Sequence, residues 1–181
     1  MINYKLGKLA VLGGYALSLL SYILQIAMNL LMGYVGRPIL FTTIIGLFSL
    51  IILAAQVGGF GIMFLDRRNI LDLGIAGAIL LNFAITIIRP TFVAPSQMAQ
   101  LSLMNIIVLA FGLLPRLIWA YKLKDKTPIA ALGLCATVAW AVLVTVLKAF
   151  FPATINWVEI IVIIINLACY GAYLFAAYSE E

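Results

Sequence analysis

The chain has 181 residues, of which 66% are hydrophobic and 9% are charged, and its formal net charge is +5. Soluble domains are about half apolar and about a quarter charged, so this composition excludes an ordinary water-soluble protein. The sequence contains no histidine, and because histidine is the usual axial ligand of haem, the commonest metal ligand and the commonest general base, we expect no cofactor, haem or metal.

Apolar runs follow one another along the chain, separated by short breaks that contain charged residues or proline. In chain order the runs cover 9–34, 39–65, 70–88, 101–121, 128–148 and 157–178. Each is long enough to cross a hydrocarbon core of about 30 Å, and helices are predicted because unpaired backbone amides are costly in lipid. The sequence therefore predicts an all-α, polytopic integral membrane protein, with a single domain of six transmembrane helices in one bundle.

Lysine and arginine residues are distributed unequally between the two sides of this topology. One side has seven, namely Lys5, Lys8, Arg67, Arg68, Lys122, Lys124 and Lys126, and the other has three, namely Arg37, Arg89 and Lys148. The excess predicts that both termini face the cytoplasm and that the chain is a multi-pass protein of the cell membrane. Lipid headgroups are the nearest anions to these short loops, so nucleic acid is not an expected partner.

Polar and small residues inside the spans recur with the period of a helix. At about 100° per residue, one face of the first helix collects Gly14, Ser18, Ser21, Gln25 and Asn29. Similar faces contain Thr42, Gly46, Ser49 and Gln56 in the second helix, Gly74, Ala78 and Asn82 in the third, Asn105, Gly112, Arg116 and Trp119 in the fourth, Gly133, Thr137, Trp140 and Lys148 in the fifth, and Glu159, Asn166, Tyr170 and Tyr173 in the sixth. Since an amide in hydrocarbon is costly without a partner, we expect these faces to point toward other helices.

Two interpretations of the polar faces stay open from the sequence. In the favoured one, the polar residues fasten helices together, and each interhelical hydrogen bond contributes about 0.6 kcal/mol. The helix-packing residues are then Ser18, Ser21, Gln25, Gln56, Thr137 and Asn166. In the alternative, polar residues near the non-cytoplasmic helix ends form a pocket for a solute or a headgroup. The candidate pocket residues are Asn29, Asn82, Asn105, Lys148 and Glu159.

Charged residues at membrane depth have individual interpretations. Lys148 and Glu159 flank a short proline-containing turn and are predicted to form an ion pair, for which a structural role is favoured over a coupling-ion site. Arg116 is expected to extend toward the cytoplasmic headgroups, with contact to an anionic headgroup or a substrate carboxylate as the alternative. Asp72, in the first turn of the third helix, is expected to favour the positive helix end and to neutralise its basic loop.

The segment Val57–Gly61 contains three glycines within four residues of a helix interior. A glycine in a helix costs about 1 kcal/mol relative to alanine, so close contact between helices is the favoured explanation. The alternative is an unwound segment that lines a site, as in transporters with broken helices, with Gln56 as a ligand group.

The sequence contains no Ser-His-Asp set, no paired intramembrane carboxylates, no HExxH motif and no phosphate-binding loop. We therefore expect a non-catalytic protein, a small accessory or structural subunit of a larger membrane complex or a homo-oligomer, with membrane lipids and other membrane subunits as partners. The alternative is a small-solute or ion transporter, or its membrane-embedded substrate-binding component. A third interpretation, a membrane enzyme acting on lipid or quinone, requires Tyr170, Tyr173 and Arg116 to converge on a lipid-accessible cavity.

Overall fold

The structure is a computed structural model that describes residues 2–32, 39–92, 98–150 and 156–180. At residue 2 and at the helix ends 29–32, 39–42, 88–92, 98–105, 147–150 and 156–159 it describes the backbone alone. These residues form six helices: α1 (Ile2–Met32), α2 (Ile39–Arg67), α3 (Ile70–Phe92), α4 (Met98–Leu123), α5 (Pro128–Phe150) and α6 (Asn156–Tyr178). Each contains a stretch that is long and apolar enough to cross a membrane. The predicted all-helical class is confirmed, and so is the number of helices that are long and apolar enough to span a membrane.

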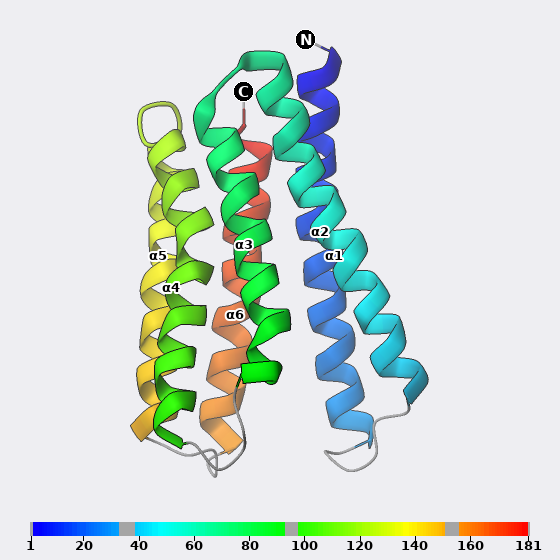
Figure 1. Cartoon of the computed structure of the whole chain (residues 1–181), viewed down its shortest axis with the longest axis vertical. Coiled ribbons are helices and arrows are strands. Elements are labelled where there is room, and N and C mark those ends of the chain that lie inside the picture. The colour runs from blue at the N-terminus through cyan, green and yellow to red at the C-terminus, as the bar shows by residue number, and fades with distance from the viewer. Residues whose placement is uncertain (1, 33–38, 93–97, 151–155, 181) are drawn as a thin grey trace.

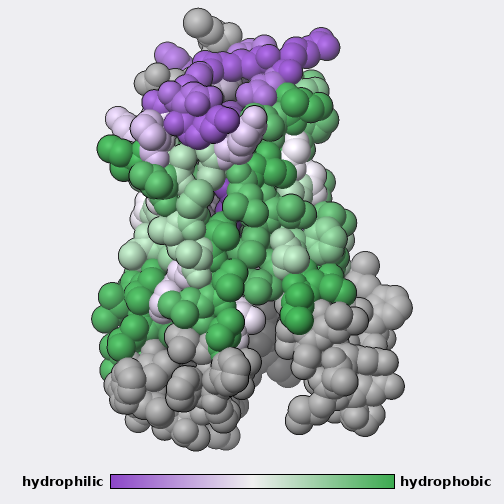
Figure 2. Space-filling model, turned by 90° about the vertical axis from the view of Figure 1, so that its left-hand side faces the viewer, coloured by the Kyte–Doolittle hydropathy of each residue, from purple (hydrophilic) through white to green (hydrophobic). Residues whose placement is uncertain are grey.

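The helices form a closed ring in chain order. Each packs against the next one along the chain, and α1 also packs against α6 (Figure 1). The start of α1, the end of α6, and the α2–α3 and α4–α5 connections all lie at the same end, at the top of Figure 1. We call it the basic end, because it contains Lys5, Lys8, Arg67, Arg68, Lys122, Lys124 and Lys126. Figure 2 shows hydrophilic residues gathered at this end, above a largely apolar middle.

The connection between α2 and α3 at the basic end is held by local hydrogen bonds. Arg68 has a positive φ of 55°, and its amide donates to the Phe64 carbonyl at 2.7 Å, which ends α2. The Asn69 side chain then accepts a hydrogen bond from the Leu71 amide at 3.1 Å and caps the start of α3. The chain therefore reverses within a few residues, and this places Asp72 beside the basic end.

Glycines allow α1 and α2 to approach each other closely. A Cβ atom added at Gly59 would lie 2.6 Å from Val11 Cγ2 and 2.7 Å from the Gly7 carbonyl oxygen. A Cβ atom at Gly14 would lie 2.8 Å from Cγ of Gln56. The helix α2 is continuous from Val57 to Gly61, so the unwound segment is wrong. The close-contact interpretation agrees with the structure at Gly59, whereas Cβ atoms added at Gly58 and Gly61 would meet nothing within 4 Å.

The side chains of the predicted polar faces mostly lie toward neighbouring helices. Gly14 and Ser21 of α1 and Thr137 of α5 are buried. The prediction is wrong for Gly46 and Ser49 of α2, which are both exposed. Ser49 donates its hydroxyl to the Ile45 carbonyl of its own helix at 2.9 Å, and a serine satisfied in this way does not need a partner helix.

The buried core lies in the half of the ring nearest the basic end. The largest fully buried apolar side chains are Trp119, Phe60, Met63, Ile75, Leu123 and Leu134, all within seven residues of that end of their helices. The outer surface is apolar. Every helix exposes large aliphatic side chains, for example Leu9, Leu47, Ile87, Ile106, Leu132 and Ile164. Such a perimeter suits hydrocarbon or another apolar protein surface.

Candidate functional site

A buried ionic cluster closes the ring at the basic end. The ammonium group of Lys122, one residue before the end of α4, lies 2.5 Å from Asp72 Oδ1 on α3 and 2.6 Å from Glu180 Oε2. The side chains of Lys122, Asp72 and Glu180 are only 9%, 1% and 2% exposed. A buried charge is tolerated only when it is paired and hydrogen-bonded. Here one lysine is the partner of two buried carboxylates that are far apart in the sequence.

Glu180, two residues after the end of α6, accepts hydrogen bonds from three side chains on two other helices. Besides Lys122, the Trp119 indole nitrogen donates to Oε1 at 2.6 Å and the Tyr4 hydroxyl donates to Oε2 at 3.0 Å. Trp119 belongs to α4 and Tyr4 to α1. The Glu180 carboxylate therefore connects the end of α6 to the neighbouring helix α1 and to α4. Charge-assisted hydrogen bonds of this kind are stronger than those between neutral groups.

A small cavity adjoins this cluster. Its volume is about 60 Å³, and it is lined by Tyr4, Arg67, Asn69, Asp72, Lys122, Leu123, Lys126 and Glu180. The second carboxylate oxygen of Asp72, Oδ2, is buried and has no hydrogen-bond partner within the described part of the chain. The Arg67 guanidinium lies 3.6 Å above the Tyr4 ring. The cavity is polar and has room for on the order of a few water molecules.

Aromatic side chains fill the centre of the ring below the ionic cluster. Tyr15 of α1 stacks on Trp119 of α4 and on Tyr173 of α6, with ring centroids 5.3 Å apart in both pairs. Phe60 of α2 meets Trp119 edge to face at 5.3 Å. Tyr170 contacts Tyr173 at 6.1 Å and also Tyr22 of α1 at 5.3 Å. These contacts extend across the ring and pack its middle with large rigid side chains.

Arg116 of α4 points into the ring rather than along the expected course toward the headgroups. Its Nη1 atom donates to the Thr137 carbonyl on α5 at 3.4 Å, and its guanidinium lies 5.4 Å from the centroid of the Tyr173 ring. At 1.5 Å per residue, Arg116 is about 10 Å from the basic end and Thr137 is about 14 Å from it. The Arg116 guanidinium therefore stays at this depth, because the Thr137 carbonyl and the Tyr173 ring lie within its reach.

Two amide side chains connect helices deeper in the ring. Asn166 of α6 donates to the Tyr22 hydroxyl of α1 at 3.0 Å and accepts from the Trp140 indole of α5 at 2.9 Å. Gln56 of α2 donates to the Ser18 hydroxyl of α1 at 3.4 Å. These bonds agree with a packing role for Ser18, Gln56 and Asn166.

Other residues predicted to fasten helices form hydrogen bonds within their own helix. Gln25 donates to Ser21 at 3.4 Å, and the Thr137 hydroxyl donates to the Leu134 carbonyl at 2.8 Å. Ser21 and Thr137 are buried, so both lie at helix contacts. Burial places these two side chains at the interface, and each also takes part in a hydrogen bond within its own helix.

Most of the candidate outward pocket falls outside the described side chains. The structure does not describe the side chains of Asn29, Asn105, Lys148 and Glu159, so the predicted Lys148–Glu159 ion pair lies outside the described residues. Asn82 is the one pocket candidate whose side chain is described. It is half-buried at the α3–α4 contact, where its Oδ1 atom would lie 3.5 Å from a Cβ atom added at Gly112.

The sequence pattern does not predict the ionic cluster at the basic end. It places Asp72 near its own basic loop and Lys122 among the loop charges, and it assigns no role to Glu180. One signal was present on the fourth helix, where Lys122 follows Arg116 and Trp119 at a spacing of three residues and so continues the inward face. The contact between Tyr4 and Glu180 depends on the packing of α1 against α6. The period of polar residues within one helix does not predict which helices pack together.

The arrangement of these residues is suited to holding helices together. Within the described ranges, no group of three or more His, Cys, Asp or Glu side chains is placed to hold a metal ion. Comparison with known proteins gives no match: no family model fits the chain, and no curated protein and no solved structure is detectably similar to it.

Proposed function

We propose that the chain is a non-catalytic integral membrane protein of the cell membrane, with its basic end in the cytoplasm, and that it works as a small accessory or structural subunit of a larger membrane complex. The observation that carries the proposal is the pairing of interior polar side chains with one another. Glu180 binds Lys122, Trp119 and Tyr4, and Asn166 binds Tyr22 and Trp140. Polar groups used in this way stabilise a ring of helices rather than present a reaction site.

The apolar perimeter is the surface that such a subunit offers. Large aliphatic side chains are exposed on all six helices, and the connections at the basic end are only a few residues long. Partner recognition would therefore occur between helices inside the membrane, by close packing and a few hydrogen bonds. A rigid ring suits this role, because its outer faces keep a fixed spacing.

A second function, a small-solute transporter or its substrate-binding component, is favoured by one observation. Arg116 places a guanidinium inside the ring, beside Tyr173 and the Thr137 carbonyl. Ionisable residues that face the interior of a membrane bundle commonly mark solute or ion paths. A carboxylate or phosphate solute would be the chemically matched substrate, because a guanidinium offers five donors in a fork that fits these anions.

The third function, an enzyme acting on lipid or quinone, required a cavity that Arg116, Tyr170 and Tyr173 line together. The three side chains do lie near one another, with Arg116 5.4 Å from the Tyr173 ring and Tyr170 6.1 Å from it. Neither of the two cavities described in the structure is lined by any of them. Nothing in the geometry therefore favours this function over the other two.

Purification from the native membrane in a mild detergent distinguishes the two leading functions. We expect a second membrane protein to co-purify in a fixed molar ratio, and we expect its abundance in the membrane to fall when this chain is deleted. Arg116→Gln should leave this association intact and should change solute uptake by less than about two-fold. Recovery of the chain alone, together with at least about ten-fold loss of uptake of an anionic solute in Arg116→Gln but not in the matched Ser49→Ala control, would overturn the subunit proposal and support transport.

A further inference from the structure

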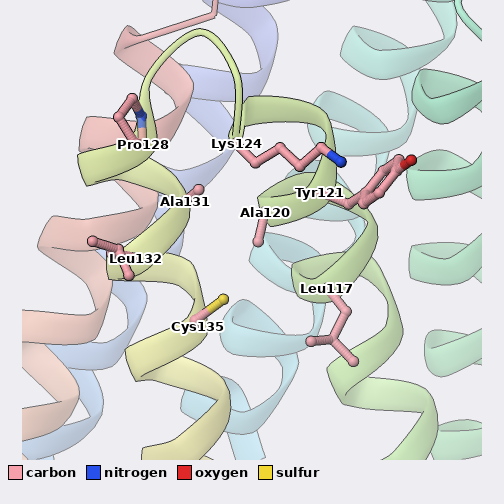
Figure 3. A pocket seen from close by; sticks show the side chains of 8 residues that line it. All are labelled: Leu117, Ala120, Tyr121, Lys124, Pro128, Ala131, Leu132 and Cys135. Carbon is pink, nitrogen blue, oxygen red and sulfur yellow. The ribbon is translucent and has the colours of Figure 1, made fainter.

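An open groove runs between α4 and α5 on the outer surface near the basic end. Its volume is about 500 Å³, within the range of about 300 to 1,000 Å³ that is usual for small-molecule sites. It is lined by Leu117, Ala120, Tyr121, Lys124, Pro128, Ala131, Leu132 and Cys135 (Figure 3). Figure 3 shows the Cys135 thiol pointing across the groove toward α4.

The groove exists because its floor is made of small residues and its rim of larger ones. Ala120 and Ala131 are buried between the two helices, whereas Leu132 on the rim is 69% exposed. The lining residues other than Lys124 belong to Ile106–Leu123 and Pro128–Val146, two segments that are long and apolar enough to cross a membrane. In the membrane-inserted chain the groove would therefore face the hydrocarbon. An apolar depression in that position fits a flexible hydrocarbon chain.

A cation lies at the mouth of the groove, where the chain leaves α4. The ammonium group of Lys124 lies 4.1 Å from the centroid of the ring of Tyr121, which also lines the groove (Figure 3). Lys122 is already paired with Asp72 and Glu180 inside the ring, and Lys126 lines the smaller cavity. Asp125 is not among the groove-lining residues. Lys124 is thus the one charged group of the groove lining.

We propose that the groove binds one anionic phospholipid, with an acyl chain between α4 and α5 and the headgroup phosphate paired with Lys124. The apolar lining matches a lipid acyl chain. The Lys124 ammonium lies toward the basic end of the groove, where the headgroup of a lipid with its acyl chain in the groove would be. A lysine near a membrane surface attracts anionic lipid with a free energy that corresponds to about a five-fold preference over neutral lipid. This inference is independent of the proposed subunit function and adds a lipid site to it.

Native mass spectrometry of the full chain tests the proposal, with phosphatidylglycerol and phosphatidylcholine as the probe lipids. We expect one phosphatidylglycerol molecule to be retained with about a five-fold preference over phosphatidylcholine. Lys124→Gln should remove the preference, because the headgroup contact is lost. Cys135→Trp should lower the retention of both lipids, because the indole would occupy the groove from an exposed position.

Two matched controls distinguish the groove from general attraction to the basic end. Lys8 also lies over a tyrosine ring at this end, 5.3 Å from the Tyr178 centroid, but it does not line the groove, so Lys8→Gln should keep the preference. Ala136 is exposed beside Cys135 without lining the groove, so Ala136→Trp should keep lipid retention. Equal retention of the two lipids by the unmodified chain, or equal effects of Lys8→Gln and Lys124→Gln, would overturn the proposal. A change of oligomeric state in Cys135→Trp with lipid retention unchanged would overturn it as well, in favour of a protein occupant.

Discussion

Replacing Lys122 by methionine is expected to lower the free energy of unfolding by about 3 to 5 kcal/mol, the usual cost of removing one partner from a buried ion pair. The substitution leaves Asp72 and Glu180 buried without their shared cation, while Trp119 and Tyr4 still donate to Glu180. Titration of the detergent-solubilised protein with a denaturing detergent measures the loss. We expect this to be the largest effect of any single charge removal among the described residues.

A compensated variant and an exposed lysine serve as controls for this prediction. Adding Asp72→Asn and Glu180→Gln to Lys122→Met removes all three charges, so most of the lost stability should return. Lys124→Met, two residues further along the chain and exposed, should change the stability by no more than about 0.5 kcal/mol. If the triple variant is as unstable as Lys122→Met alone, the charges are not the reason for the loss.

The glycine contact between α1 and α2 has the second largest expected effect. Gly59→Ala would place a Cβ atom 2.6 Å from Val11 Cγ2, 2.7 Å from the Gly7 carbonyl oxygen and 2.9 Å from the Val11 amide nitrogen. Backbone atoms cannot move aside independently, so the two helices must separate, at a cost of about 1 to 3 kcal/mol. Gly59→Leu should cost more, because the longer side chain separates the helices further. The same detergent titration measures both changes.

The neighbouring glycine provides the matched control. A Cβ atom at Gly58 meets nothing within 4 Å, so Gly58→Ala should leave the stability unchanged or raise it by up to about 1 kcal/mol through helix propensity. Equal destabilisation by Gly58→Ala and Gly59→Ala would mean that the effect of Gly59→Ala does not come from the close approach of α1 and α2.

The helices were predictable because lipid requires long, apolar and fully hydrogen-bonded spans. The six spans agree with α1 to α6, and the largest difference is the start of α1, which begins at residue 2 rather than 9 because the helix continues through Lys5 and Lys8. The helical period also placed Ser21 and Thr137 correctly at buried positions. The helical period failed for Gly46 and Ser49, which are exposed. A glycine, or a serine that bonds a carbonyl of its own helix as Ser49 does, also tolerates an exposed helix face.

The charged cluster was not predictable in the same way. Tyr4 and Glu180 are separated by 176 positions, and they meet only because α6 packs against α1. Periodicity within one helix contains no information on which helices become neighbours across the ring. The direction of the Arg116 side chain was not predictable for the same reason, because the Thr137 carbonyl that accepts its hydrogen bond belongs to another helix.

Cross-linking between the first and last helices tests the closed ring most directly. Lys8 and Tyr178 lie at the surface of the α1–α6 contact, with the ammonium 5.3 Å from the ring centroid, whereas Tyr121 is exposed on α4. In a chain whose Cys135 and Cys169 are replaced by serine, we expect Lys8→Cys with Tyr178→Cys to form an efficient cross-link within one molecule through a short bismaleimide. Lys8→Cys with Tyr121→Cys should form none. A cross-link in the second pair, or its absence in the first, would contradict the ring in which the ionic cluster is buried.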